Sequence, residues 1–206
     1  MSRPSIYKIL EIPTFYNFIQ WFLAPGLRKL MGKVHQGIFA NSKGRVLDVG
    51  CGPKLTTPIP EGNIYFVDIN HACIRSFQKL MNRNLGCVCS SDKLPFFDSS
   101  FTGTRCIGVL HHMSDKMAVK TIREMYSCVS NGGVVIIDEP VWPKNACFRP
   151  LAWMLQFLDR GKWVRTEEEW ITLTLKAVKG NWEKSRYTST YLGQEEVVLK
   201  IMKLQH

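Results

Sequence analysis

The stretch Arg45-Val46-Leu47-Asp48-Val49-Gly50-Cys51-Gly52-Pro53 decides the fold. Its first part is a short apolar run with one acidic residue, and glycine and proline residues end it, which is typical of a buried strand followed by a tight turn. Glycine lets a backbone take turn conformations and approach a ligand closely. The stretch therefore predicts a strand that ends at a ligand-binding loop.

Similar apolar runs follow it and alternate with amphipathic helical patterns. The expected strands cover residues 45–49, 64–68, 87–89, 104–110, 134–138 and 196–203. The expected helices cover 70–83, 116–129, 149–158 and 167–178, the last with Thr166 as its N-cap. Strands that are apolar throughout and separated by helices indicate an α/β fold with a mostly parallel sheet covered on both faces.

The composition restricts the class of protein. The 206 residues include 45% hydrophobic residues, which excludes a disordered chain and suits one domain. No stretch reaches the roughly 18 uncharged apolar residues that a membrane-spanning helix needs, and we expect no secretory signal. The seven cysteines are mostly scattered singly, which favours free thiols, a cytoplasmic location and no metal site.

The net charge of +10 leaves two interpretations open. The basic residues are dispersed and form no long run, which is typical of a solvated basic surface. Alternatively, the charge attracts an anionic partner, such as a phospholipid surface, an anionic substrate or RNA.

Three carboxylates are expected near the ends of consecutive strands: Asp48, Asp68 and Asp92. In an open parallel sheet, ligands bind beyond the carboxyl ends of the strands. The dinucleotide fingerprint would need a glycine at position 55, where Leu55 stands, and no phosphate-binding loop is present. S-adenosylmethionine, an adenosine joined to an amino acid without phosphate, meets this description.

At these residues the sequence resembles the class I S-adenosylmethionine-dependent methyltransferases, especially the small-molecule branch of ubiquinone/menaquinone-type enzymes. The resemblance covers roughly residues 45–140, and its matching stretches are 46–53, 67–69, 91–96 with Asp98 and Phe101, 110–113, 131–133 and 138–140. It implies a Rossmann-like, doubly wound, mostly parallel seven-stranded sheet with an N-terminal helical segment. It also implies one methyltransferase domain over 1–206, with a helical lid or cap at 1–42, a cofactor-binding core at 43–140, and substrate-side and C-terminal strands at 141–206.

The resemblance also implies the cofactor-binding residues. The Gly50–Gly52 loop would hold the methionine part, Asp68 the ribose and Asp92 the adenine amine. Ile69 and Lys93 would flank the adenine, Leu110 and His111 would border the transferable methyl group, and Tyr16 would close over the methionine end. The full implied set is Tyr16, Asp48, Gly50, Cys51, Gly52, Asp68, Ile69, Asp92, Lys93, Leu110 and His111.

The sequence departs from the family pattern after the glycine loop. Lys54 stands where a further glycine is usual, and Pro53, Pro58 and Pro60 interrupt the helix expected next. We therefore expect a truncated first helix and a more open cofactor pocket there. This departure also motivates a non-catalytic interpretation that keeps the fold.

His111, His112 and Glu139 are the catalytic candidates. Histidine is the side chain most able to take a proton near neutral pH, so either histidine can act as a base or position the substrate, and Glu139 competes for the role. Alignment alone can also suffice for methyl transfer. The aromatic residues of the C-terminal part are either core or the wall of an acceptor pocket: Trp142, Trp153, Phe157, Trp163 and Trp170.

The sequence thus predicts methyl transfer to O, N or C of a small-molecule acceptor. The alternatives are an RNA or protein methyltransferase, suggested by the charge, and a non-catalytic protein. We expect the acceptor pocket between residues 1–42 and 139–170, with residues 12–34 acting as a lid. The competing interpretation of 12–34 is peripheral contact with an anionic membrane.

Overall fold

The computed structural model describes residues 44–53, 62–82, 85–144, 150–157, 161–190 and 192–204. The predictions for residues 1–42, including Tyr16, and those for Lys54, Pro58 and Pro60 lie outside this range. In chain order, the elements are β1 (Gly44–Val49), β2 (Gly62–Asp68), α4 (His71–Met81), β3 (Gly86–Val88), β4 (Phe101–Ile107), η1 (Leu110–His112), α5 (Asp115–Cys128), β5 (Val129–Val141), α6 (Pro150–Phe157), α7 (Glu167–Ala177), β6 (Asn181–Thr188) and β7 (Glu195–Met202).

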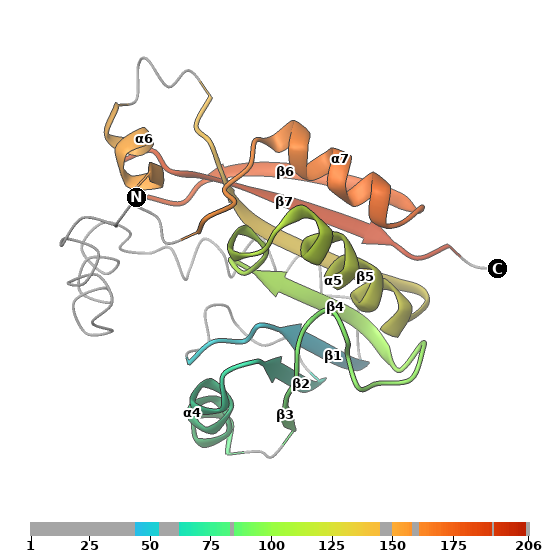
Figure 1. Cartoon of the computed structure of the whole chain (residues 1–206). Helices are drawn as coiled ribbons and strands as arrows, with labels where there is room; N and C mark the ends of the chain where they lie inside the picture. The colour runs from blue at the N-terminus through green and yellow to red at the C-terminus, as the bar shows by residue number, and fades with distance from the viewer. Residues whose placement is uncertain are drawn as a thin grey trace.

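The strands form one seven-stranded sheet in the order β3-β2-β1-β4-β5-β7-β6 (Figure 1). Neighbours from β3 to β5 are parallel, whereas β7 is antiparallel to both β5 and β6. The α/β class is confirmed, and the sheet is mixed. The chain leaves β1 toward β2 on one side and later returns to β4 on the other, so the end of β1 is a point where the strand order reverses. Ligands bind at such points in open α/β sheets.

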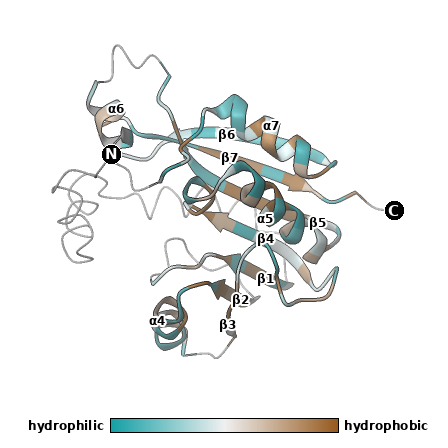
Figure 2. Cartoon of the chain, viewed as in Figure 1, coloured by the Kyte–Doolittle hydropathy of each residue, from teal (hydrophilic) through white to brown (hydrophobic). Residues whose placement is uncertain are grey.

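Helices cover both faces of the sheet. On one face, α5 and α7 pack against the main core, which includes Leu47, Val49, Val135 and Ile137. On the other, Ile74 and Phe77 of α4 pack against Phe66 and Cys51. Figure 2 shows the hydrophobic colours concentrated on the strands, with hydrophilic colours over much of α5 and α7. Burial of these apolar side chains provides the main driving force for the arrangement.

Three local features differ from the sequence prediction. The strand expected at 104–110 ends at Ile107, because Gly108 has a positive φ of 62° and the chain then forms the short η1 turn. β5 begins at Val129 and includes residues 131–133, which were expected to form a turn before the strand. Its register with β4 shifts between Phe101 and Gly103. The prediction did not locate β6, whose first five residues are exposed.

The predicted N-cap of α7 is confirmed. The Thr166 hydroxyl accepts from the Glu169 amide at 3.2 Å, and the Glu169 carboxylate accepts from the Thr166 amide at 2.7 Å. This reciprocal capping box satisfies two amides that would otherwise lack partners at the helix start.

No helix among the described residues is long and apolar enough to cross a membrane. The six cysteines within the described ranges are free thiols. The cytoplasmic location stays a prediction.

A partly buried acidic cluster joins β5, β6 and β7. The Tyr187 hydroxyl lies 2.8 Å from both Asp138 Oδ2 and Glu196 Oε2. Burial raises the pKa of Asp138 to about 7 and that of Glu196 to about 8, although hydrogen bonds from Tyr187 act in the opposite direction. The folded protein therefore retains protons on this cluster that an unfolded chain releases above its ordinary carboxyl pKa.

We expect the free energy of unfolding to fall as pH rises from about 5 to 8, because the unfolded carboxyl groups ionise near 3.8 and 4.5 while the folded pair ionises near 7 and 8. Urea unfolding at several pH values measures this slope. Asp138→Asn should flatten it, while Glu183→Gln, on the exposed part of β6, should leave it unchanged. A wild-type slope of the opposite sign would contradict this account.

Candidate active site

The glycine loop at the end of β1 is built by two positive backbone angles. Gly50 has a φ of 73° and Gly52 a φ of 63°, a region that L-residues with side chains rarely adopt. The amides of Gly50 and Cys51 both donate to the Val67 carbonyl, at 2.8 and 3.1 Å, which ties the loop to β2. A Cβ atom on Gly50 would lie 2.7 Å from the Val109 side chain, whereas one on Gly52 would meet no described atom within 4 Å. With respect to the described residues, the loop is therefore fixed on one side and open at Gly52.

Asp68, at the end of β2, faces this loop. Its Oδ2 accepts from the Gly52 amide at 3.0 Å, and its Oδ1 accepts from the Asn70 amide at 2.7 Å. Each carboxylate oxygen has two lone pairs, so Asp68 can accept further hydrogen bonds from a ligand. Next to it, Ile69 is 74% exposed and presents an apolar side chain beside a polar one.

Asp92 lies in the turn after β3, near the same edge of the sheet. The Ser90 hydroxyl donates to its Oδ1 at 2.6 Å, and Lys120 Nζ lies 3.9 Å from its Oδ2. The neighbouring Lys93 is exposed. Asp68 and Asp92 thus follow two adjacent parallel strands, β2 and β3, as the sequence predicted.

Two other predicted cofactor residues have their side chains engaged in the interior. Asp48 forms a 2.6 Å ion pair with Arg105 on β4, and both side chains are buried. The Cys51 side chain packs beside Phe66, and burial raises the pKa of its thiol, so the thiol stays neutral. Cys51 can contact a ligand at this loop through its backbone, whereas Asp48 holds Arg105.

The buried carboxylate of Glu139, on β5, organises the turn after β4. Its Oε1 accepts from the amides of Val109 and Leu110 at 2.9 and 2.7 Å. Its Oε2 accepts from the His111 amide at 3.1 Å and lies 2.7 Å from His111 Nδ1. Four contacts to one carboxylate fix both the turn and the His111 ring.

Arg165 holds the same turn from the other side. Its guanidinium donates to the carbonyls of Leu110, Met113 and Trp163 at 3.3, 2.8 and 2.9 Å, and pairs with Asp115 at 2.8 Å. The guanidinium also lies 4.5 Å from the Trp170 ring centroid. Arg165 could not be predicted from the sequence, because no local motif marks an arginine whose partner Asp115 lies 50 positions away.

The structure brings His111 and Glu139 together and separates the roles of the two histidines. His111 is buried against Glu139, whereas His112 is exposed, with its ring centroid 4.1 Å from that of His111. The predicted Leu110 side chain lies in the main core. The contact between Glu139 Oε2 and His111 Nδ1 fits the tautomer that carries its proton on Nδ1, and Nε2 is then the acceptor nitrogen of the ring.

The C-terminal aromatic residues divide between core and site. Trp170 is fully buried in the core, while Trp142 and Trp153 form a tilted pair with ring centroids 5.9 Å apart. Trp163 is half exposed, and its amide donates to the His111 carbonyl at 2.9 Å. The Phe157 side chain lies outside the described residues.

Known proteins share this fold and part of this sequence. Residues 47–137 match a family described as a methyltransferase domain. A tRNA U34 carboxymethyltransferase of Campylobacter curvus is 40% identical over 47 residues, which are 23% of this chain and 15% of that protein. The chain therefore aligns with only a small part of this curated relative.

Similar solved structures cover nearly the whole chain at low identity. An S-adenosylmethionine-dependent methyltransferase of Thermotoga maritima has a TM-score of 0.69 at 14% identity, covering 96% of this chain and 99% of that one. The methyltransferase domain of the citrinin polyketide synthase has a TM-score of 0.71 at 11% identity, covering 98% and 60%. A [4+2]-cyclase has a TM-score of 0.66 at 15% identity, covering 86% and 81%. These structures share the fold of this chain, and residues 47–137 within it match the methyltransferase domain family.

Glu139→Gln should destabilise the protein by about 2 kcal/mol, because an amide places a donor where a buried carboxylate now accepts hydrogen bonds. Urea unfolding measures the loss. The control, Glu168→Gln at an exposed position in the first turn of α7, should change the free energy of unfolding by less than about 0.5 kcal/mol. Equal stability of both variants would contradict the importance given to Glu139.

Proposed function

We propose that this chain, whose residues 47–137 match the methyltransferase domain family, transfers a methyl group from S-adenosylmethionine to O, N or C of a small-molecule acceptor. The observation that carries the proposal is the turn at 108–113, where Glu139 orients His111 and Val109 lies against Gly50 of the glycine loop. A Cβ atom on Gly50 would collide with the Val109 side chain, so the glycine loop and this turn lie against each other. A ligand on the loop would therefore lie near the turn.

The residues at the sheet edge suit S-adenosylmethionine. Asp68 has acceptor capacity for ribose hydroxyls, the exposed Ile69 offers an apolar surface for the adenine ring, and Asp92 can accept from the adenine amine. The open side of Gly52 leaves space for the amino-acid part. The buried ion pair with Arg105 gives Asp48 a supporting role beneath the loop.

The bound cofactor would supply an electrophilic methyl group on a positively charged sulfur. We infer that His111 Nε2 accepts the proton of an O–H or N–H acceptor as the acceptor's lone pair forms the new bond to carbon. The electron pair of the carbon–sulfur bond would remain with the sulfur of the bound cofactor. Glu139 stabilises the resulting imidazolium and keeps the ring in position, so it acts as a positioning residue.

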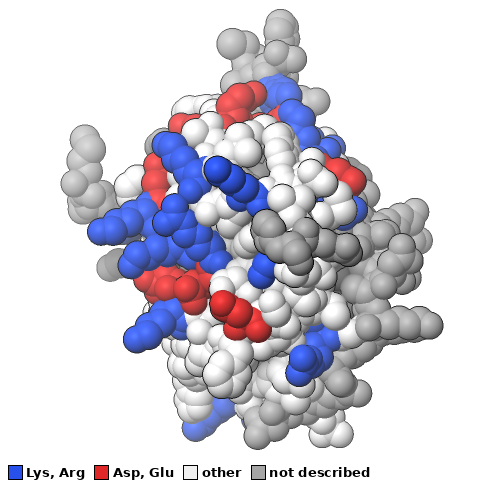
Figure 3. Space-filling model, turned by 90° about the vertical axis from the view of Figure 1, so that its right-hand side faces the viewer, with Lys and Arg blue, Asp and Glu red and all other residues white. Residues whose placement is uncertain are grey.

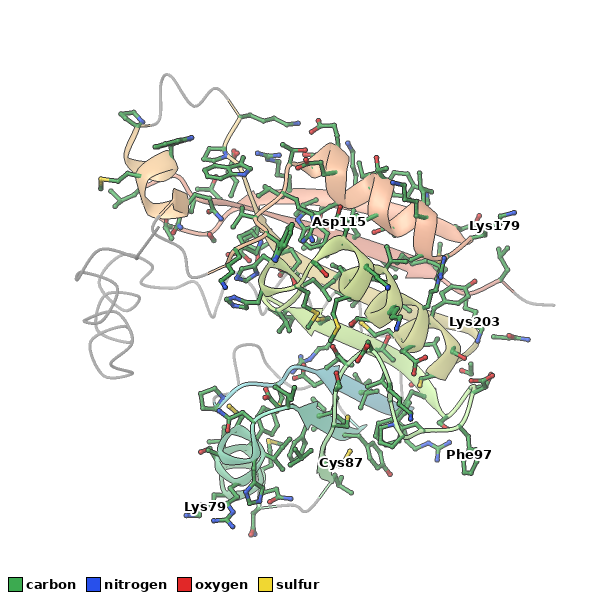
Figure 4. All side chains as sticks on the ribbon, in the orientation of Figure 1. Lys79, Cys87, Phe97, Asp115, Lys179 and Lys203 are labelled. Carbon is green, nitrogen blue, oxygen red and sulfur yellow. The ribbon has the colours of Figure 1, made fainter. Side chains whose placement is uncertain are left out.

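Two basic side chains lie away from the proposed reaction site. Figure 3 shows one face of the molecule, on which Lys and Arg side chains are densest toward one side and also lie elsewhere among Asp and Glu side chains. Figure 4 places Lys179 and Lys203 at the end of the molecule opposite to α6, away from the carboxyl ends of the parallel strands. These two lysines would not guide an RNA toward His111.

An RNA acceptor is the second candidate, because a tRNA-modifying enzyme shares 47 aligned residues with this chain and the net charge is +10. Steep salt dependence of RNA binding would favour it. Three further proposals can be tested in the same assays. The first is a quinone-type acceptor, the second is a membrane-borne acceptor contacted by residues 12–34, and the third is a protein that keeps the fold without activity.

Asp68→Ala should weaken S-adenosylhomocysteine binding by about 1.5–3 kcal/mol, because the variant loses a charged acceptor for the ribose. Isothermal titration calorimetry measures this effect. Asp98→Ala, at an exposed carboxylate in the turn before β4, is the control and should leave affinity unchanged. Equal affinities of the wild type and Asp68→Ala would remove Asp68 from the site.

Release of S-adenosylhomocysteine in a coupled assay tests the reaction itself. The panel should contain phenols, amines, quinones, lipids and transfer RNA, each incubated with S-adenosylmethionine. We expect turnover with at least one small molecule and a large loss in His111→Ala. Turnover only with transfer RNA would replace the small-molecule proposal, and cofactor binding without turnover on any acceptor would favour a non-catalytic protein.

A further inference from the structure

Two turns of the proposed site follow strands that are not neighbours in the sheet. The adenine turn, residues 90–94, follows β3 and carries Asp92, whereas the reaction turn, residues 108–113, follows β4 and carries His111. In the order β3-β2-β1-β4, two strands lie between them. Adjacent strands are about 4.8 Å apart, so the two turns are separated by roughly 14 Å across the sheet. Strand pairing therefore gives them no direct contact.

A cluster of three side chains connects the two turns. Ser91 lies in the adenine turn, Met113 ends the reaction turn, and Thr121 lies on α5. The Ser91 and Thr121 hydroxyl oxygens are 3.0 Å apart, and they lie 3.8 and 3.7 Å from the Met113 sulfur. Thr121 is fully buried. The three side chains thus form a triangle that joins both turns to the helix.

The contact between the two hydroxyls is the strongest part of this cluster. A hydroxyl both donates and accepts hydrogen bonds, whereas a thioether sulfur is a weak acceptor. Two hydroxyl protons serve three contacts, so one hydroxyl donates to the other and the second can donate to the Met113 sulfur. Without the Thr121 hydroxyl, the link from Ser91 to this cluster would depend on the weak sulfur acceptor.

α5 supports the adenine turn at two further points. The Glu124 carboxylate accepts from the Leu94 amide at 2.9 Å, and Lys120 Nζ lies 3.9 Å from Asp92 Oδ2. Residues three and four positions apart share one face of a helix, so Lys120, Thr121 and Glu124 all lie on the same side of α5. Figure 1 shows the segment after β3 rising to α5 before it turns into β4.

The start of the same helix is tied to the reaction turn. Arg165 pairs with Asp115, the first residue of α5, at 2.8 Å, and donates to the Met113 carbonyl at 2.8 Å. The backbone of Met113 is therefore held where its side chain reaches the two hydroxyls. Thr121 is the position on α5 where contacts from both turns meet.

From this geometry we propose that Thr121 is a positioning residue for the cofactor. The adenine and the sulfur of S-adenosylmethionine are joined through one ribose, so a cofactor that contacts both turns requires them at a matched separation. The Thr121 hydroxyl holds Ser91, and the adjacent Asp92 is thereby placed to accept from the adenine amine while the reaction turn faces the sulfur. This inference rests on the proposed function, because it assigns a role at that same site.

Recognition of the adenine amine gives a measurement that a merely structural role would not change. S-adenosylhomocysteine carries this amine, and S-inosylhomocysteine carries a carbonyl oxygen in its place. Titration calorimetry with each ligand gives the ratio of the two affinities. We expect the wild type to prefer S-adenosylhomocysteine at least about tenfold, because the Asp92 carboxylate accepts from an amine and is repelled by a carbonyl oxygen.

Thr121→Val keeps the shape of the side chain and removes the hydroxyl, so it should lower this ratio by about fivefold or more. Thr121→Ser keeps the hydroxyl and should hold the ratio within about twofold of the wild-type value. Thr174→Val is the matched control, since Thr174 is a buried threonine on α7 whose hydroxyl has no hydrogen-bond partner among the described residues. An unchanged ratio in Thr121→Val, or an equal loss in Thr174→Val, would overturn the inference.

Ser91→Ala removes the other hydroxyl of the link and completes a double-mutant cycle. It should lower the ratio to a similar extent, and the double variant should lower it no further than the larger single change. Effects that multiply in the double variant would mean that Thr121 acts independently of Ser91, which would overturn the positioning role.

The wild-type titrations separate this inference from the proposed function. If the wild type shows the expected preference and Thr121→Val keeps it, the positioning role is wrong while the assignment of the cofactor stands. If the wild type binds both ligands equally, the positioning role is also wrong, because the adenine amine is then not recognised. If the wild type binds neither ligand, the proposed function fails and the inference fails with it.

Discussion

The site depends on one buried carboxylate. Glu139 is fully buried, and its two oxygens hold the amides of three consecutive residues together with the ring of His111. A buried charge is unfavourable unless hydrogen bonds compensate it, so this turn and this carboxylate require each other. Arg165 completes the arrangement by donating to carbonyls of the same turn. The segment at 108–113 is therefore a rigid element, although it has almost no regular secondary structure.

The order of the strands brings the remaining groups to this turn. β1 lies between β2 and β4, so the glycine loop stands beside Asp68 on one side and Val109 on the other. The Asp48–Arg105 ion pair joins β1 to β4 beneath the loop. Removal of either partner would leave a buried charge uncompensated, so the pair also fixes the relative position of these two strands.

Much of this arrangement could be predicted from the sequence, because it follows from local patterns. The apolar runs of β1 and β2, the glycine loop and the N-cap of α7 each have a signal within a few residues. β6 lacked such a signal, because it is a polar edge strand whose first five residues are exposed, so no hydrophobic alternation marks it. Arg105 and Arg165 were missed for a different reason, because their roles come from contacts between residues far apart in the chain.

The central claim is that the glycine loop and the Glu139-held turn form the two sides of one cofactor site. A crystal structure with S-adenosylhomocysteine tests it most directly. The account predicts ribose hydroxyls on the Asp68 carboxylate, the adenine beside Ile69 and the sulfur facing the turn at 108–113. Electron density for the ligand at any other edge of the sheet, or with its sulfur directed away from His111, would contradict the claim.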